Sequence, residues 1–428
     1  MFTVISFLLA ISLLVFVHEL GHYLAARFVG VKVLEFSVGF PPKAIGKKIG
    51  ETEYILSWIP IGGYVRLLGQ DSEDENPDEP GNYASKSKRE RLLILVAGPA
   101  MNILFAWVFF TLLFFTGYER PAYLGGPPQL AAVTPGSAAE KVGLLAHDLI
   151  LAVDGLEVKT WAEAQARLEE AGPEQLELKV LRSGQELRLF FPEDQLALGP
   201  LGIEPLIAPL VGKLSPGNPA ELAGLLPGDK ILAIGGEPVE GWSSITPLVQ
   251  KSKGEPFLLT FEREGNTQTV TLTPKMDGRL GFYIIGLSQA NQRVSYGILE
   301  SSVQGYKRAE FLTKKSFEFI GTIFQGKADK DSLGGPIMIA QLVGQAAKNS
   351  FGDLLALMGF ISLQLGIFNL FPFPALDGGH VLFLGLEMAK GGPLNKSIRE
   401  KVQKFGFSAL LLLILYISVQ DGLRLLSQ

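Results

Sequence analysis

Four stretches of the chain contain few or no charged side chains and are apolar along most of their length. They are residues 2–26, 92–116, 354–376 and 405–420. A helix needs about 20 mainly apolar residues to cross the hydrocarbon core of a bilayer. The third stretch is interrupted near its end by Pro372 and Pro374, and the fourth reaches this length only with its flanks. The pattern predicts four transmembrane helices, with both chain ends on the same side.

A signal peptide is the alternative interpretation of the first stretch. Such a peptide has a positively charged segment before its apolar run. This chain has no Lys or Arg there, and Glu19 lies inside the apolar run between two histidines. Both features favour a membrane helix that remains in the protein.

Basic residues cluster in two of the three connections between the predicted spans. Those after the first span and before the second are Arg27, Lys32, Lys86, Lys88, Arg89 and Arg91, and those between the third and fourth are Lys390, Lys396, Arg399, Lys401 and Lys404. Short connections rich in Lys and Arg stay in the cytoplasm. The long connection, roughly residues 120–350, is therefore predicted to lie outside it.

That outer connection contains an internal repeat. VTPGSAAEKVGLLAHDLILAVDGLEVKTW (133–161) aligns without gaps on LSPGNPAELAGLLPGDKILAIGGEPVEGW (214–242), and each copy continues into a helical segment and two alternating strands. A fixed period of this size indicates a duplicated folded unit. The order of elements resembles the circularly permuted bacterial form of the PDZ domain. PDZ domains bind extended peptide ends at a sheet edge; spacers that bind nothing are the alternative.

Composition narrows the possible functions. The chain of 428 residues is 47% hydrophobic and has a net charge of −5 without a long basic run, so nothing favours nucleic-acid binding. It has no cysteine, which excludes disulfides, thiolate metal sites and cysteine nucleophiles. The acidic stretch DSEDENPDEP (71–80) is expected to be a solvated cytoplasmic loop.

The first apolar stretch carries a candidate metal site, His18-Glu19-Leu20-Gly21-His22. Residues four apart share one face of a helix, with Cβ atoms about 5–6 Å apart. Both imidazoles can therefore bind one zinc ion, with Glu19 as the general base for water. Ionisable groups near the middle of a bilayer cost on the order of 2.5–3.5 kcal/mol each. Three together favour a metal site over a packing role.

A catalytic zinc ion takes three protein ligands and keeps one position open for water. Asp377, in NLFPFPALDGGH (369–380), is the only acidic residue of the third apolar segment and its exit. The prolines and glycines around it predict irregular backbone, which is tolerated at membrane depth where protein or a wet cavity surrounds it. Asp377 is the expected third ligand. His380 is the alternative, and is otherwise expected to support Asp377.

Taken together, these motifs resemble the site-2 protease family of intramembrane zinc metalloproteases. The family signatures His-Glu-x-x-His, Asn-x-x-Pro…Asp-Gly and Gly-Pro-x-x-Asn are matched by His18 to His22, by Asn369, Pro372, Asp377 and Gly378, and by Gly98, Pro99 and Asn102. The resemblance covers essentially the whole chain. Within the family it extends to a bacterial four-span enzyme with two tandem PDZ domains in the periplasm.

The resemblance implies a role for each matching residue. His18, His22 and Asp377 are expected to bind one Zn²⁺ ion per chain, with Glu19 as the catalytic acid and base. Substrate backbone is expected to bind near Asn369 and near Gly62, Gly63 and Tyr64. The last three lie in YILSWIPIGGYVRLLG (54–69), which resembles the family's membrane-associated β-hairpin; an ordinary amphipathic hairpin is the alternative. Supporting or structural roles are expected for Gly98, Pro99, Asn102, Pro372 and Gly378.

The expected fold is an α-helical polytopic membrane protein with four transmembrane helices and a membrane-associated β-hairpin. Two tandem α+β PDZ domains are inserted between the second and third spans. The expected boundaries are 1–30 (first helix), 31–91 (cytoplasmic region with the hairpin), 92–118 (second helix), 122–195 and 200–276 (PDZ domains), 295–350 (membrane-surface helices), 352–376 (third segment) and 402–426 (fourth helix).

The expected function is regulated intramembrane proteolysis of single-pass membrane proteins whose outer domain has been shed. By resemblance, substrates include an anti-sigma factor of the envelope stress response and remnant signal peptides, and the PDZ copies contact peptide ends or outer domains. The expected location is the bacterial inner membrane, with the PDZ copies in the periplasm and the active site toward the cytoplasm. The rivals are a PDZ-bearing membrane adaptor or chaperone with a structural metal, and a metal transporter. Spans two and four offer a transporter almost no polar groups.

Overall fold

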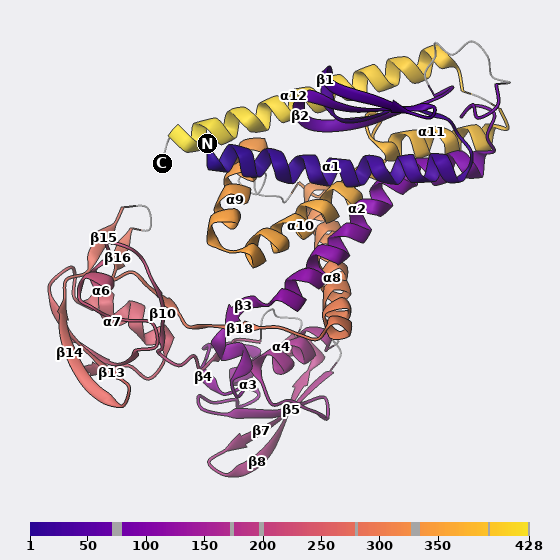
Figure 1. Ribbon diagram of the computed structural model, residues 1–428. Helices are drawn as coiled ribbons and strands as arrows, with labels where there is room; N and C mark the ends of the chain where they lie inside the picture. Colours follow the sequence, from indigo (N-terminus) through magenta and orange to yellow (C-terminus); the bar gives the residue numbers. More distant parts are fainter. Residues whose placement is uncertain are drawn as a thin grey trace. The chain divides into compact units, whose positions relative to one another are not determined.

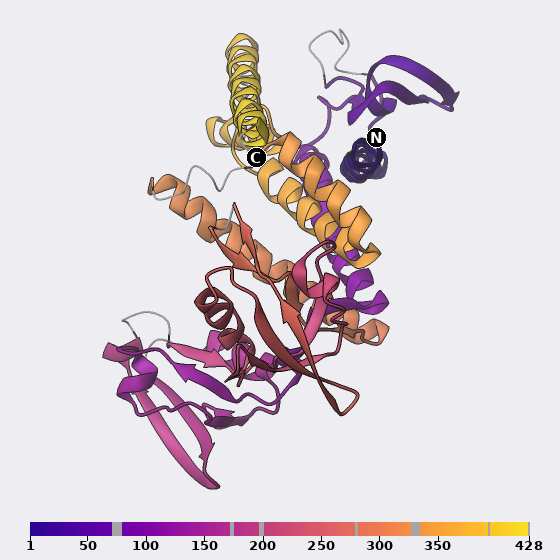
Figure 2. The ribbon, with the colours of Figure 1, turned by 90° about the vertical axis from the view of Figure 1, so that its left-hand side faces the viewer.

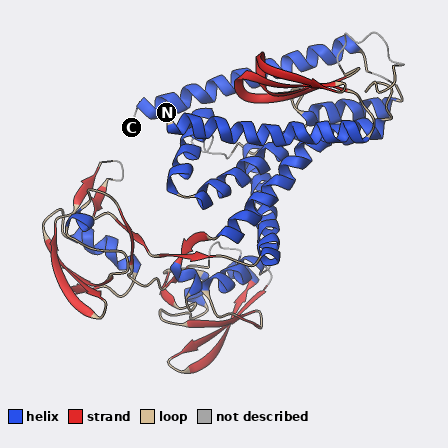
Figure 3. Cartoon of the chain, viewed as in Figure 1, coloured by secondary structure: helices blue, strands red, loops and turns tan. Residues whose placement is uncertain are grey.

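The computed structural model describes residues 1–70, 79–171, 175–196, 201–278, 281–326, 334–392 and 394–426. Most of the acidic stretch 71–80 lies outside these residues. The chain forms two compact units, one made of Met1–Tyr118 with Val294–Gln428 and the other of Glu119–Arg293. The first unit is mainly helical and the second contains most of the short strands (Figure 3).

Four helices in the described part of the first unit are long and apolar enough to cross a membrane. They are α1 (Phe2–Phe28), α2 (Lys88–Thr116), α10 (Phe351–Asn369) and α12 (Lys396–Leu426). Ser87 begins α2 with a capping box, because its side chain accepts from the Glu90 amide while the Glu90 carboxylate accepts from the Ser87 amide. The four helices coincide with the four apolar stretches of the sequence.

The third apolar stretch does not continue as one helix. α10 ends at Asn369, and α11 (Asp377–Lys390) begins after a short irregular segment. Pro372 and Pro374 lie in that segment, and a proline has no N–H to continue the hydrogen-bond ladder of a helix. The break brings Asp377 to the first turn of a new helix.

Helix α2 is the centre of the first unit. It packs against α1, α10 and α8 (Ile298–Phe324), as Figure 1 shows, and α9 (Pro336–Asn349) packs against α1 and α10. Leu14 of α1, Phe110 of α2 and Leu363 of α10 are almost fully buried in this core. The axes of α1 and α2 approach closely at Gly21, where an added Cβ would collide with the carbonyl of Ala97.

The segment that follows α1 forms a sheet against that helix (Figures 1 and 2). Strand β1 (Val33–Ile49) pairs with β2 (Thr52–Leu67), and the register places β2 on both sides of β1, since Val38 faces both Leu56 and Gly63. The hairpin that the sequence predicted at 54–69 is therefore one part of a wider antiparallel sheet that also includes residues 33–49.

In the second unit, the sequence repeat forms two sheets with the same strand order, β6-β5-β7-β8 and β12-β11-β13-β14. The first copy contains β4 (Leu130–Val133), α3 (Ala138–Lys141), β5 (Leu149–Val153), β6 (Leu156–Glu157), α4 (Trp161–Glu170), β7 (Gln175–Arg182), β8 (Gln185–Pro192), α5 (Glu193–Leu196) and β9 (Ile203–Pro205). The second contains β10 (Val211–Leu214), α6 (Pro219–Leu222), β11 (Lys230–Ile234), β12 (Glu237–Pro238), α7 (Ile245–Lys251), β13 (Phe257–Arg263), β14 (Asn266–Leu272), β15 (Lys275–Asp277), β16 (Phe282–Ile284) and β17 (Leu287–Gln289).

Each copy contains the same buried ion pair at equivalent positions. Arg182 binds Asp148 through Nε and Nη2, each at 2.7 Å. Arg263 binds Asp229 in the same way at 2.8 and 2.7 Å. Burial works to raise the pKa of Asp229, but the hydrogen bonds from Arg263 and from a backbone amide outweigh burial and hold that pKa below its ordinary value. The duplication thus preserves packing and polar contacts together.

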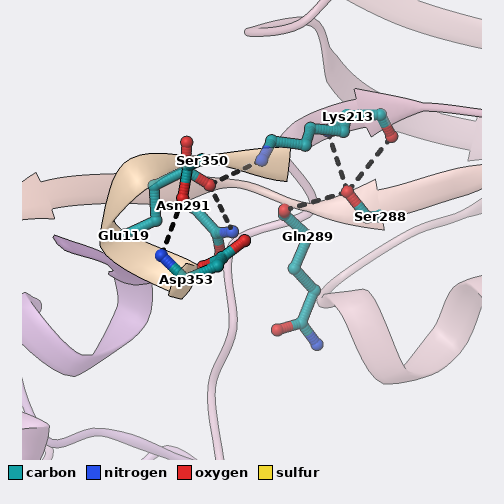
Figure 4. A network of polar contacts seen from close by, with 7 residues as sticks. All are labelled: Glu119, Lys213, Ser288, Gln289, Asn291, Ser350 and Asp353. Atoms are coloured by element: carbon teal, nitrogen blue, oxygen red, sulfur yellow. Dashed lines mark hydrogen bonds and ion pairs between the residues drawn. The ribbon is translucent and has the colours of Figure 1, made fainter. Parts of the chain in front are cut away.

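The first and last strands of the second unit, β3 (Tyr118–Pro121) and β18 (Asn291–Val294), pair with each other. Nζ of Lys213 donates to Glu119 at 2.7 Å, and Asn291 donates to the same carboxylate at 3.4 Å (Figure 4). Ser288 bonds the Lys213 backbone, joining β10 to β17. In the first unit, Ser350 caps α10 by accepting from the Asp353 amide (Figure 4).

Candidate metal centre

His18 and His22 lie one turn apart on the buried face of α1, and their imidazoles converge. Their Nε2 atoms are 3.2 Å apart, and His18 is 9% exposed. The buried positions of this part of α1 include Leu14, Val17 and Gly21, so the two histidines extend an apolar face that packs on α2. The sequence prediction that both rings share one helix face agrees with this geometry.

Asp377 reaches the same point from the start of α11. Its Oδ2 lies 3.1 Å from Nε2 of His18, and its Oδ1 lies 3.6 Å from Nε2 of His22. Gly378 and Gly379 hold the beginning of α11 against the preceding loop, because an added Cβ at either position would collide with backbone carbonyls of that loop. These glycines let Asp377 approach the two histidines.

The three side chains fit a zinc ion. Their ligand atoms all lie within 4.8 Å of one another. Ligands about 2.0–2.1 Å from a tetrahedral zinc ion are roughly 3.3–3.4 Å apart. The two imidazole Nε2 atoms are 3.2 Å apart, and each has one oxygen of Asp377 near it, Oδ2 at 3.1 Å from His18 and Oδ1 at 3.6 Å from His22. Two imidazole nitrogens and a carboxylate oxygen are also ligands that zinc takes in catalytic sites.

His380, the alternative third ligand, does not belong to this cluster. It lies on α11, and both of its ring nitrogens are 3.4 Å from Nε2 of Gln403 on α12. His380 also lines a polar cavity of about 390 Å³ together with Tyr83, Arg91, Glu387 and Arg399. Burial raises the pKa of Tyr83 to about 12.

Helix α2 contacts both histidines at their Nδ1 atoms. Nδ1 of His22 lies 2.8 Å from the carbonyl oxygen of Ile94, and Nδ1 of His18 lies 3.1 Å from Nδ2 of Asn102. Gly98 lies between these positions, directly against the ring of His22, where no Cβ could fit. Pro99 follows it in the helix interior and supplies no N–H.

Glu19 is held by the sheet. The backbone of Val65 lies beside its carboxylate. A Cβ on Gly63 would lie 3.2 Å from Cγ of Glu19 and 2.7 Å from the carbonyl oxygen of Ser37, so β2 approaches the glutamate where this strand has no side chain. Gly62 adopts φ +99°, a conformation that favours glycine. Tyr64 instead donates to Glu35 at 2.9 Å, within the sheet.

Asn369 is the last residue of α10 and is half-buried. Its side chain has no hydrogen bond within the described part of the chain. Pro372 lies in the loop between Asn369 and Asp377.

Sequence reasoning missed how the histidines are supported. The Ile94 partner is a backbone carbonyl, which has no side-chain signature. Ser362 of α10, fully buried, donates to the Asn102 carbonyl at 2.7 Å, and only a single serine in an apolar span marks this contact in the sequence. The one available signal was the Gly-Pro-x-x-Asn element, which named Asn102 without naming its partner.

Comparisons with known proteins give matches over most of the chain. A model of peptidase family M50 matches residues 6–413. Regulator of sigma-E protease RseP of Salmonella typhimurium is 32% identical over 436 residues, which cover 96% of each chain, and its counterpart in Escherichia coli K12 gives the same values. A Neisseria meningitidis protein that carries a zinc metalloprotease name is 31% identical over 450 residues, covering all of both chains. A solved PDZ domain of an SdrC-like protein from Listeria monocytogenes covers 19% of this chain, at 17% identity and a TM-score of 0.17.

Proposed function

The chain belongs to peptidase family M50, the site-2 proteases, and on this premise we propose that His18, His22 and Asp377 bind the single zinc ion of an intramembrane metalloprotease, with Glu19 as its catalytic acid and base. The observation that carries the proposal is the convergence of three zinc-type ligand atoms, contributed by two separate helices inside an apolar unit. Bound zinc would supply a Lewis acid that activates water and polarises the scissile carbonyl.

Glu19 is placed for proton transfer beside the two histidines. In peptide hydrolysis, its carboxylate would take a proton from the attacking water and return that proton to the nitrogen of the leaving amine. The bond between the carbonyl carbon and the amide nitrogen breaks, and water is divided between the two products. The Val65 backbone beside this carboxylate would help to keep it in place for both transfers.

Substrates are proposed to be single-pass membrane proteins whose outer domain has already been removed. Two of the relatives are named as regulators of sigma-E, which supports a membrane-bound anti-sigma factor as one substrate and leaves remnant signal peptides as a second class. A transmembrane helix hides its peptide bonds in its own hydrogen bonds. Asn369 and the edge of β2 near Gly62, Gly63 and Tyr64 would hold the unwound strand.

The two repeated units are proposed to be periplasmic PDZ domains that bind peptide ends or exclude bulky outer domains. Each carries a groove beside its main helix, of about 330 Å³ in the first copy, lined in part by Trp161 and Leu168, and about 260 Å³ in the second, lined in part by Trp242 and Val249. The basic residues that flank the spans support an inner-membrane orientation with the metal site toward the cytoplasm.

The test uses the purified full-length protein, its zinc content and its cleavage of a model transmembrane substrate. Glu19→Gln should retain one zinc ion and lose cleavage, because only the proton carrier is removed. Asp377→Asn should lose most of the zinc, whereas His380→Asn should keep it, as should His147→Asn, a change in the first copy of the repeat. Unchanged cleavage by Glu19→Gln would sink the catalytic assignment of Glu19, and absence of cleavage by the wild-type protein would favour the adaptor. Normal zinc in Asp377→Asn would sink the ligand assignment.

A further inference from the structure

The imidazole of His18 contacts a second polar side chain besides Asp377, the carboxamide of Asn102. Nδ2 of Asn102 lies 3.1 Å from Nδ1 of His18, and Asn102 is fully buried. Its other polar atom, Oδ1, is also buried and has no hydrogen-bond partner among the residues that the structure describes. An unpaired buried acceptor costs about 1–3 kcal/mol. Asn102 therefore has hydrogen-bonding capacity that the metal-free arrangement leaves unused.

The two nitrogens of a neutral imidazole have opposite roles, since one donates and the other accepts. In the structure, Nδ2 of Asn102 donates to Nδ1 of His18, which leaves the ring proton on Nε2. That proton has two acceptors within reach, Oδ2 of Asp377 at 3.1 Å and Nε2 of His22 at 3.2 Å. A metal ion bound at Nε2 replaces this proton. The ring proton must then move to Nδ1, and Nδ1 needs an acceptor in place of a donor.

We propose that Asn102 is a positioning residue of the zinc site, whose carboxamide oxygen accepts the Nδ1 proton of His18 and so keeps Nε2 free for the metal. The inference rests on the proposed function, in which His18 is a zinc ligand. A half-turn of the carboxamide exchanges Oδ1 and Nδ2. Oδ1 loses no hydrogen bond in this rotation, because it has no partner among the residues that the structure describes.

The remainder of the residue is fixed. Ser362 donates to the backbone carbonyl of Asn102 at 2.7 Å, which ties this turn of α2 to α10 and does not involve the carboxamide. His22 needs no comparable residue, because its Nδ1 already faces the Ile94 carbonyl, a permanent acceptor, at 2.8 Å. Asn102 would therefore serve both states of His18: as donor to the metal-free ring and as acceptor from the metal-bound ring.

The test compares zinc affinities of full-length variants, measured by competition with a chelator of known affinity. Partners of this kind typically contribute 10- to 100-fold to metal affinity. Asn102→Leu, which has similar volume and no acceptor, should weaken zinc binding within that range. Asn102→Asp, which retains an acceptor, should bind at least as tightly as wild type. The matched control is Ser362→Ala, which changes packing at the same place and should stay within about two-fold of wild type.

Zinc affinity of Asn102→Leu within two-fold of wild type would overturn the proposal. If Asn102→Leu does not fold, Asn102→Asp still decides, because weak binding in a folded Asp variant contradicts the acceptor role. His18→Ala distinguishes this result from failure of the ligand set. If His18→Ala retains wild-type affinity, the proposed function fails; if it loses zinc while Asn102→Leu does not, only the role of Asn102 fails.

Discussion

Replacing Gly98 with Ala would test whether α2 sets the position of His22. A Cβ at this position would press on Nε2 of His22 and lie 2.7 Å from Cε1 and 2.8 Å from Cδ2. Non-bonded carbon atoms are most stable about 3.5–4.0 Å apart, so the ring must retreat by roughly 0.7 Å or more. The ring cannot easily rotate instead, because its Nδ1 is hydrogen-bonded to the carbonyl of Ile94, which lies one turn before Gly98 on α2.

Zinc sites tolerate errors of only about 0.2 Å in ligand distance, so Gly98→Ala should lower zinc affinity at least about tenfold. Misplacement of a reacting group by about 1 Å can cost on the order of a hundredfold in rate, and cleavage of a transmembrane substrate should fall accordingly. Chelator competition and a substrate gel on purified protein measure both effects.

The control is Gly385→Ala on α11, where an added Cβ meets no heavy atom within 4 Å. This change should leave zinc affinity unaltered and stabilise the helix by about 0.5–1 kcal/mol. Wild-type zinc affinity and cleavage in Gly98→Ala would refute the close packing of α2 against His22.

Two further predictions concern stability. Asp421 is 3% exposed, and its carboxylate accepts from the amides of Gly335 and Met338 at the start of α9. Asp421→Ala removes this cap, so it should lower the free energy of unfolding by about 0.5–2 kcal/mol and lower the melting temperature of the full chain. The control, Val419→Ala, changes an exposed position of α12 and should leave the melting temperature unaltered. The pKa of Asp229 is lowered despite burial, so its pairing with Arg263 should stabilise the second copy fully above about pH 4 and lose this effect as pH falls through the lowered pKa. Arg263→Met should flatten this acid dependence in melting curves recorded from pH 7 to 2, and an unchanged slope would contradict the assignment.

The features that could be predicted from sequence are those that the bilayer itself imposes. Apolar spans are long because each must cross the full hydrocarbon core. Charged groups are costly inside that core, so the ionisable groups of the proposed metal site stand out in the sequence. Asp377 could be singled out because no other acidic residue lies in the third stretch or its exit. The repeat could be found because duplication leaves a constant offset along the chain, visible in pairs such as Asp148 and Asp229.

The features that sequence did not reveal depend on backbone groups and on packing between distant segments. The second half of β1, FPPKAIGKKI (40–49), breaks the alternation of a strand with two prolines, one glycine and three lysines, yet it pairs with residues 52–59. The acceptor for His22 is the carbonyl of Ile94, which any residue could supply. The hydrogen bond of Ser362 joins two spans that are far apart in the chain.

In the proposed zinc site, the division of roles among three helices would make zinc binding and helix packing interdependent. α1 supplies two imidazoles, α11 supplies the carboxylate, and α2 supplies the partners of both Nδ1 atoms at Ile94 and Asn102. The glycine contacts at Gly21 and Gly98 bring α1 and α2 close enough for these bonds. An ion that binds only the assembled form stabilises that form in proportion to the logarithm of its concentration. Substitutions on α2 that never touch the ion should therefore weaken zinc binding, and removal of zinc should loosen the contact between α1 and α2.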